Sequence, residues 1–149
     1  MPLSSLNSPA PAGEKTASSS VASVCVYCGT GSDVDEVYRV GAAALGAALA
    51  AADVRLVYGG GSVGLMGIVS KSAMEAGGRV MGIIPAHLSE KEGQAHDISE
   101  LVIVDSMHAR KTMMVDNADA FVVLPGGLGT LEEMFEILTW KYLGLHDKP

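Results

Sequence analysis

The segment 120–142 constrains the fold most, because a buried strand, a glycine loop and an amphipathic helix follow one another in it. Residues 121–124 are apolar without alternation, as in a strand covered on both faces of a parallel sheet. Three glycines follow Pro125 and let a ligand approach backbone amides closely. Apolar residues return at the helical period from Leu131 onward. The start of that helix favours an anion, since unpaired amides and the helix dipole face the loop.

Two acidic residues, Glu132 and Glu133, stand in the first turn of this expected helix. The string T-L-E-E fits a capping box, with Thr130 as the N-cap and Glu133 reaching back to its amide. A catalytic role for Glu133 is the alternative. The two roles are compatible, because a capping carboxylate lies at the mouth of the same loop.

The order of strand and helix recurs along the whole chain. We expect strands at residues 21–27, 55–58, 79–84 and 101–104, and helices that begin at a Ser32 cap, after Gly64 and at a Ser106 cap. Residues 85–97 are polar and predict a loop with a short helical turn. This alternation predicts an α/β fold, a Rossmann-like doubly wound parallel sheet in three α/β/α layers, with the ligand loops at the carboxyl ends of the strands.

The domain organisation follows from composition along the chain. Residues 1–20 are rich in Ser, Pro and Ala and predict a disordered tail, and residues 21–149 predict a single nucleotide-binding domain. No strand follows the helix at the end of the sequence, so we expect that the C-terminal end of the fold is missing.

A second glycine loop follows the second expected strand. Gly59, Gly61 and Gly64 satisfy G-x-G-x-x-G, the fingerprint of a dinucleotide fold. The fingerprint normally follows the first strand, and the acidic residue expected at the end of the next strand is absent. Leu65 stands where a Walker A loop needs lysine. Glycines that only allow tight helix–sheet packing remain an alternative.

Two cations, Arg110 and Lys111, fall near the start of the helix after Ser106. Cations are disfavoured there, so their presence indicates an anionic partner. A guanidinium can hold a phosphate or ribose hydroxyls with two hydrogen bonds. For Lys111, a solvated surface charge is an equal alternative.

Charge and cysteine content exclude several classes. The 10 basic and 17 acidic residues give a net charge of −7, which argues against a nucleic-acid polymer as partner. Cys25 and Cys28 could form a redox pair, but three positions apart on a strand they point to opposite faces, so buried free thiols are favoured. The four histidines show no ligand spacing, and we expect no metal. No apolar run predicts a signal peptide or a membrane span, and we expect a cytoplasmic protein.

Two motifs together resemble the signatures of a known family. P-G-G-L-G-T-L-E-E at 125–133 and M-H-A-R-K at 107–111 resemble the LOG family, the cytokinin riboside 5′-monophosphate phosphoribohydrolases, whose members were often labelled lysine decarboxylases in error. The string G-G-G-S-V-G-L-M-G at 59–67 is similar to the family as well. The resemblance implies cleavage of the N-glycosidic bond of an adenosine 5′-monophosphate, N6-prenylated in the family, to free base and ribose 5-phosphate. It implies no cofactor, and a homodimer with the site at or near the interface.

The resemblance also implies the site. Glu133 would stabilise an oxocarbenium-like ion and position water, and Arg110 would orient the ribosyl phosphate and Glu133. Thr130 and its loop would hold the 5′-phosphate, and Glu92 stands where the family has a substrate-contacting glutamate. The full substrate-binding set is Gly29, Thr30, Gly60, Gly61, Glu92, Met107, Lys111, Gly126, Gly127, Leu128, Gly129, Thr130, Leu131, Glu132 and Thr139.

Two other functions remain as alternatives. Related folds carry nucleotides or a molybdopterin-type cofactor without catalysis, and such a carrier needs the phosphate loops but not the carboxylate. A lysine decarboxylase would need pyridoxal phosphate on a lysine, and no lysine here follows a motif of that type.

Overall fold

The computed structural model describes residues 20–92 and 94–149. The expected disordered tail therefore lies outside the described residues, apart from Ser20. Strands and helices alternate through the described part as β1 (Ser23–Tyr27), α1 (Glu36–Ala51), β2 (Arg55–Tyr58), α2 (Gly64–Glu75), β3 (Val80–Pro85), α3 (Ala86–Glu92), β4 (Glu100–Val104), α4 (Met107–Asp116), β5 (Ala120–Val123) and α5 (Leu128–Tyr142). No described helix has the length and apolar character that crossing a membrane requires.

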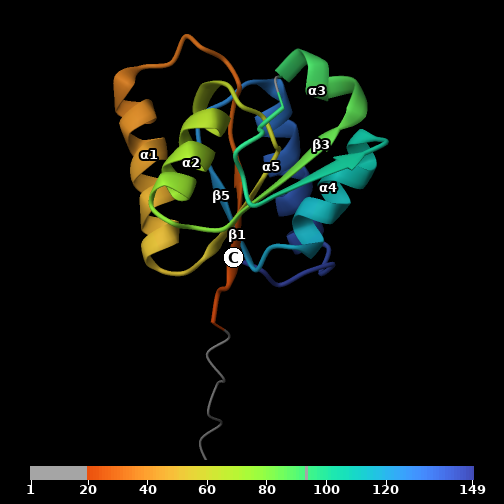
Figure 1. Cartoon of the computed structure of the whole chain (residues 1–149). Coiled ribbons are helices and arrows are strands. Elements are labelled where there is room, and N and C mark those ends of the chain that lie inside the picture. The colour runs from red at the N-terminus through yellow and green to blue at the C-terminus, as the bar shows by residue number, and fades with distance from the viewer. Residues whose placement is uncertain (1–19, 93) are drawn as a thin grey trace, which may run out of the picture.

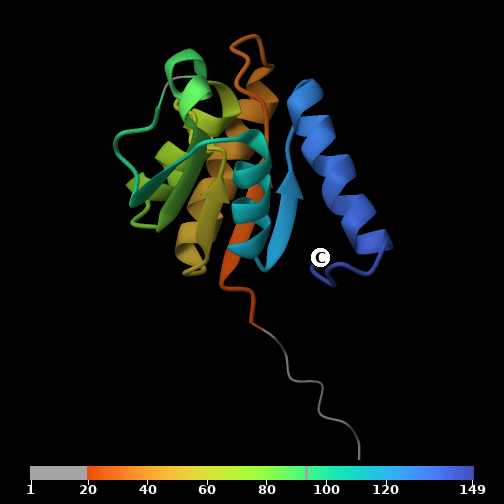
Figure 2. The same cartoon turned by 90° about the vertical axis from the view of Figure 1, so that its right-hand side faces the viewer.

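The five strands form one parallel sheet in the order β4-β3-β2-β1-β5. Val24 of β1, an interior strand, pairs with Leu56 of β2 on one side and with Ala120 of β5 on the other. The strand order runs outward from β1 to β4 and then returns to place β5 on the far side of β1. The order of the sheet therefore reverses between β1 and β5, which lie side by side in Figures 1 and 2. This confirms the predicted α/β fold with a parallel, doubly wound sheet.

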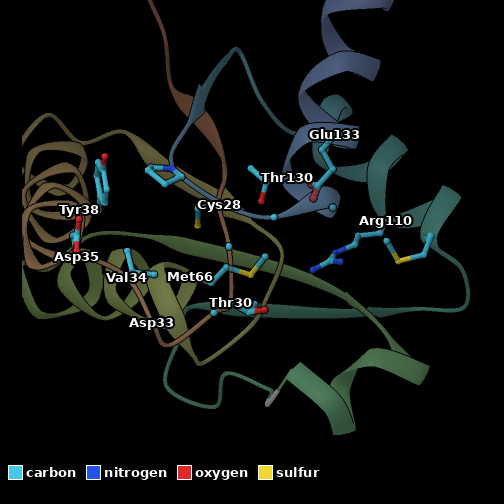
Figure 3. Close-up of a pocket in the computed structure, with 17 residues that line it drawn as sticks. Cys28, Thr30, Asp33, Val34, Asp35, Tyr38, Met66, Arg110, Thr130 and Glu133 are labelled. Carbon is cyan, nitrogen blue, oxygen red and sulfur yellow. The ribbon is translucent and has the colours of Figure 1, made fainter.

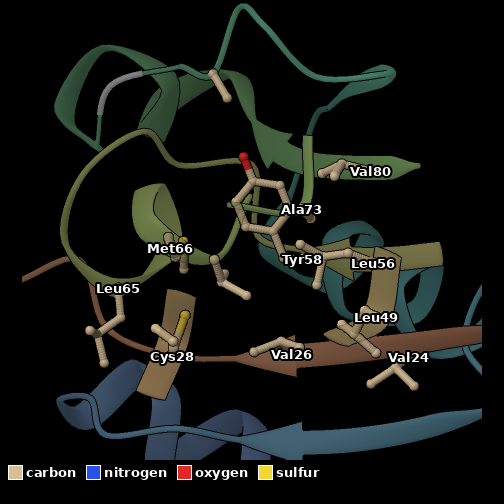
Figure 4. Close-up of a cluster of buried hydrophobic side chains, with 13 residues drawn as sticks. Val24, Val26, Cys28, Leu49, Leu56, Tyr58, Leu65, Met66, Ala73 and Val80 are labelled. Carbon is tan, nitrogen blue, oxygen red and sulfur yellow. The ribbon is translucent and has the colours of Figure 1, made fainter. Parts of the chain in front are cut away.

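Two apolar cores separate the three layers. The first core lies between the sheet and helices α1 and α2, and Figure 4 shows Val26, Leu56 and Tyr58 of the sheet within it. The second core lies on the opposite face, where Met114 of α4 and Ile137 of α5 pack on the sheet. Alternate residues of β1 enter opposite cores, since side chains of a strand alternate between faces.

The cysteines follow the same rule. Cys25 belongs to the core under α4 and α5, whereas Cys28 belongs to the core under α1 and α2. Both thiols are buried and free. The expectation of two buried thiols on opposite faces is confirmed, and the alternative of a redox pair is wrong.

Helix α1 starts later than the sequence predicts. Its N-cap is Asp35, not Ser32. The side chain of Arg39 explains the delay, because it donates hydrogen bonds to the carbonyl oxygens of Ser32 (2.5 Å) and Val34 (3.1 Å) and so holds the preceding loop outside the helix. Val37 in the first turn of α1 is exposed, and the buried residues of the helix are Ala42, Gly46 and Leu49.

Two further helices bear on the predictions. The loop with a short helical turn expected at 85–97 contains α3, a helix of seven residues. Ser106 is confirmed as the N-cap of α4, because its Oγ accepts a hydrogen bond from the amide of Ala109 at 3.0 Å. The amide of Arg110 donates to the carbonyl oxygen of Ser106 at 3.1 Å, so Arg110 lies in the first turn of α4.

Candidate functional site

A cavity of about 730 Å³ lies at the carboxyl ends of β1 and β5. Open α/β sheets bind ligands at the point where strand order reverses, and this cavity occupies that point. Its walls come from the β1–α1 loop, the first turn of α1, the first turns of α2 and α4, and the β5–α5 loop with the start of α5 (Figure 3).

The two loops that follow β1 and β5 are joined directly. The amide of Gly29 donates a hydrogen bond to the carbonyl oxygen of Pro125 at 3.1 Å. A Cβ added to Gly29 would lie 2.9 Å from the Cα of Gly126, and a Cβ added to Gly126 would overlap the hydroxyl of Thr130. Close approach of the two backbones thus requires glycine at both positions.

Helix α5 opens onto the cavity with free amides. Its N-cap is Gly127, which has no side chain to cap it, and the first backbone bond runs from the amide of Leu131 to the carbonyl of Gly127. The amides of residues 128–130 therefore have no acceptor within the helix. Together with the helix dipole, they favour an anion at this end of the cavity.

The predicted capping box is wrong. The N-cap is Gly127, three residues before the predicted one, so Thr130 lies inside the first turn of the helix and is buried beside Gly126. The capping pattern was misleading because the glycine loop itself adopts the extended backbone that an N-cap needs. Glu133 therefore does not form the predicted capping box with Thr130, and its side chain lines the cavity.

Arg110 is a buried cation in the wall of the cavity, with 3% of its surface exposed. Its Nε donates to the carbonyl oxygen of Ile83 at 3.0 Å, and its Nη2 donates to that of Gly59 at 2.6 Å. A Cβ on Gly59 would overlap Nη2. The first glycine of the second glycine loop therefore makes room for the guanidinium, a role that the dinucleotide reading does not include.

Glu133 lines the same cavity from α5 and is 8% exposed. Figure 3 shows the side chains of Arg110 and Glu133 extending into the cavity from α4 and α5. The charge on Glu133 also acts on the cavity wall, because burial first and this carboxylate second raise the pKa of Cys28 to about 12. Cys28 is therefore a neutral thiol at neutral pH.

Lys111 lies outside the cavity lining. Its Nζ donates to Glu132 Oε1 at 2.6 Å and to Glu136 Oε2 at 3.0 Å. The hydrogen bond to Glu132, followed by that to Glu136, raises the pKa of Lys111 above its ordinary value, although partial burial opposes the rise. The side chain is 15% exposed, so Lys111 is not a solvated surface charge.

The cavity brings together some, but not all, of the predicted site residues. Those that line it are Gly29, Thr30, Met107, Arg110, Gly126, Gly127, Gly129, Thr130 and Glu133. Those that do not are Gly60, Gly61, Lys111, Leu128, Leu131, Glu132 and Thr139. The side chain of Glu92 lies outside the described residues.

The second glycine loop supports a neighbouring segment instead. The carbonyl of Gly60 accepts a hydrogen bond from the amide of Ala95 at 3.1 Å, and Gly61 forms an antiparallel bridge with Gln94. Gly60 has a φ of +74°, a conformation that favours glycine. This loop therefore holds the segment after α3 against the sheet.

Sequence reasoning missed one wall of the cavity. Asp33, Val34, Asp35 and Tyr38 line it from the α1 side, as Figure 3 shows. The predicted helix with Ser32 as its N-cap would instead place them in its first turns. Among the described residues, no group of three or more His, Cys, Asp and Glu is arranged to hold a metal ion.

Comparison with known proteins agrees with this arrangement. The model of the family described as "Possible lysine decarboxylase" matches residues 66–149. A protein of Arabidopsis thaliana named cytokinin riboside 5′-monophosphate phosphoribohydrolase is 49% identical over 126 residues, which cover 85% of this chain and 55% of that protein. Another of that name and organism is 44% identical over 137 residues, covering 92% and 64%. The chain thus spans 55% and 64% of the length of these two relatives.

Solved structures share the fold. The molybdenum cofactor carrier protein of Chlamydomonas reinhardtii superposes with a TM-score of 0.69 at 26% identity, covering 80% of this chain and 71% of that one. The molybdenum cofactor binding protein of Rippkaea orientalis also gives a TM-score of 0.69 at 26% identity, covering 83% and 74%. Since the family model covers more than half of the chain and its two motifs form one cavity, the chain belongs to the LOG family, the family whose model is described as "Possible lysine decarboxylase".

Proposed function

We propose that the protein hydrolyses the N-glycosidic bond of adenosine 5′-monophosphates, including N6-modified ones, to the free base and ribose 5-phosphate. One observation carries the proposal: buried Arg110 and Glu133 share a cavity with the uncapped start of α5. A phosphoribohydrolase needs an anion site, a fixed cation and a carboxylate within the length of one nucleotide. The names of the relatives that are 44–49% identical support the same activity.

The 5′-phosphate would bind at the start of α5. The amides of residues 128–130 and the hydroxyl of Thr130 would donate hydrogen bonds to its oxygens. Gly126 leaves space for this approach, because any side chain there would collide with Thr130. The carbonyls of Ile83 and Gly59 fix the guanidinium of Arg110, which would orient the ribosyl phosphate without reorganising.

Glu133 would act at C1′ of the ribose. As the C1′–N9 bond breaks, its electron pair goes to the base, which takes up a proton, and positive charge develops on the sugar. The carboxylate of Glu133 stabilises that charge and accepts a proton from water, whose oxygen forms the new bond to C1′. Residues 21–149 would form the nucleotide-binding domain in which this occurs, and no cofactor takes part.

The test is release of free base from AMP and from N6-isopentenyl-AMP, measured by chromatography. Wild type should release adenine and isopentenyladenine, and Glu133→Gln should bind the nucleotide but release no base. Glu75→Gln is the matched control, because it removes an exposed carboxylate of α2. Full activity in Glu133→Gln, or no release by wild type, would contradict the proposal.

A non-catalytic carrier is the second candidate, because the similar solved structures are named molybdenum cofactor carrier or binding proteins. A carrier would retain a bound nucleotide or a molybdopterin-type cofactor without releasing a base. Wild-type protein that binds AMP in calorimetry and leaves it intact would favour this function.

We also propose a homodimer through α5. Leu128, Leu131, Phe135, Leu138 and Tyr142 repeat at heptad spacing along one face of α5, and all are exposed. An exposed apolar stripe of this kind is typical of an interface. Leu131 and Thr139, which the family resemblance assigns to the substrate, lie on the exposed side of α5, so a second copy would bring them near a cavity.

Light scattering after size-exclusion chromatography tests the dimer. Phe135→Glu (60% exposed in wild type) should yield monomers, whereas Val40→Glu on α1 (59% exposed) should not change the mass. A monomeric wild type would refute the dimer. We further place the protein in the cytoplasm, because its two cysteines are free and a reducing compartment keeps thiols in that state.

A further inference from the structure

An ion-pair cluster of Lys111, Glu132 and Glu136 joins α4 to α5 next to the cavity. Lys111 contacts two carboxylates that lie one helical turn apart on α5, at 2.6 Å and 3.0 Å. The cluster is one residue from each proposed catalytic group, because Lys111 follows Arg110 and Glu132 precedes Glu133. The cluster therefore joins the two backbone segments that carry these groups.

Helix α5 has few apolar contacts with which to hold that position. Along its 15 residues, its buried side chains are Thr130, Glu133 and Ile137, and Trp140 is partly buried in the core beneath it. Its other apolar side chains are mainly on the exposed stripe. Within one copy of the chain, the pairs that reach across to α4 therefore add to the few apolar contacts that hold the start of α5.

The ion pairs of Lys111 are only weakly screened by solvent, because its side chain is largely buried. Its side chain is largely shielded from solvent, and Glu136 is shielded more than Glu132, so salt and water screen the 111–136 pair less than an exposed pair. Both carboxylates raise the pKa of Lys111, which keeps it charged. With two acceptors on α5 and no place in the cavity lining, Lys111 is directed to the helix and not to a ligand.

We propose that Lys111 and Glu136 are positioning residues, which fix the first turns of α5 against α4 and thereby align Glu133 with Arg110. This inference rests on the proposed hydrolysis of nucleoside monophosphates, and it replaces direct substrate contact as the role of Lys111. Glu136 acquires a function that neither of the two sequence motifs includes.

A double-mutant cycle on the intact chain tests the proposal. Lys111→Met and Glu136→Gln should each lower kcat for base release by about tenfold, with KM changed less than about twofold, because misalignment affects the transition state more than binding. The combined variant should be no slower than Lys111→Met, since both changes break one contact. Lys111→Arg should recover most of kcat, because it keeps the charge and the donors.

Lys71→Met and Glu75→Gln provide the matched control. They remove the same charges from an exposed pair on α2, 3.8 Å apart, and should leave kcat and KM unchanged. A KM for AMP that rises in Lys111→Met while Glu136→Gln behaves as wild type would show that Lys111 contacts substrate, and would overturn the proposal. Multiplying effects in the combined variant would overturn it as well.

Hydrogen exchange of the unliganded protein separates this inference from the proposed function. Amides of residues 131–136 should exchange about tenfold faster in Lys111→Met and in Glu136→Gln than in wild type, with unchanged exchange in β1. A lysine that only contacts substrate would leave that exchange unaltered, which would refute the positioning role. If the variants exchange faster but wild-type protein releases no base, the contact between α4 and α5 would be supported and the proposed hydrolysis would be rejected.

Discussion

Replacing Arg110 with methionine tests how much the buried guanidinium stabilises the fold. The change removes the donors to Ile83 O and Gly59 O, which lie at 3.0 Å and 2.6 Å from the guanidinium nitrogens. Hydrogen bonds to a charged group contribute about 1.5–3 kcal/mol each, so two such bonds give about 3–6 kcal/mol. Methionine carries no charge, so the variant avoids the cost of desolvating a buried cation, which offsets part of this loss. We expect a net loss of about 3 kcal/mol in the free energy of unfolding.

Urea unfolding followed by the fluorescence of Trp140, the single tryptophan, measures this loss. Trp140 packs on the core beneath α5, so its emission should change on unfolding. At about 2–4 °C per kcal/mol for a domain of this size, the melting temperature should fall by about 6–12 °C. The slope of the urea transition should not change, because the substitution alters little of the surface exposed on unfolding.

Arg79→Met is the matched control. Arg79 also donates to two oxygens, both of Asp53, but its side chain is 56% exposed. We expect its replacement to cost less than about 1 kcal/mol. Arg110→Lys should recover only part of the loss, because an ammonium cannot reproduce the planar fork. If Arg110→Met cost no more than Arg79→Met, the buried carbonyls would not depend on the guanidinium, and the reasoning would be refuted.

Three further outcomes are expected. Gly126→Ala should lower base release by about tenfold or more, because its methyl group would displace Thr130; Gly41→Ala, whose Cβ meets no atom within 4 Å, should not, and equal activity in both would contradict the steric argument. Cys28, with its pKa raised to about 12, should resist iodoacetamide at pH 8 in the folded protein and react in urea, and labelling of the native thiol would show that it is accessible and ionised. Asp119 accepts hydrogen bonds from two amides at the start of β1, which hold its pKa below the ordinary value. Its contribution to stability is therefore present above that ordinary pKa and lost as pH falls through the folded pKa, so Asp119→Asn should be less stable than wild type at pH 6 but not at pH 2, as urea titrations at both values would show.

The sequence predicted the sheet because its strands read as largely apolar runs. β1, β2 and β3 are buried along most of their length, whereas β4 and β5 are partly exposed. The runs around Val57 and Ile83 are buried throughout, and no alternation of polar residues confuses them. Helix starts were harder to predict. The start of α1 depends on Arg39, whose side chain bonds carbonyls five and seven positions upstream, and capping rules do not include such contacts.

The site could be predicted where its residues belong to the two sequence motifs. Arg110 and Glu133 were identified from two motifs, and both line one cavity. The partners of Lys111 were not predictable, because Glu132 is 21 positions away and no local pattern links the two helices. The role of Gly59 was missed for the same reason, since the guanidinium that fills its empty side comes from α4.

The position of β1 between β2 and β5 has a consequence for how the protein acquires its cavity. Among the described strands, β1 is synthesised first, yet one of its two neighbours, β5, is synthesised last, and Asp119, which accepts a hydrogen bond from the amide of Ala22, is 97 positions away. During synthesis, the edge of β1 that pairs with β5 has no partner strand while β2 to β4 pair on its other edge. The loops that follow β1 and β5, which are joined by the hydrogen bond from Gly29 to Pro125, come together only when β5 pairs with β1. Nucleotide added during refolding should therefore bind in the final step alone, and partly assembled chains would expose an open strand edge in place of a ligand site.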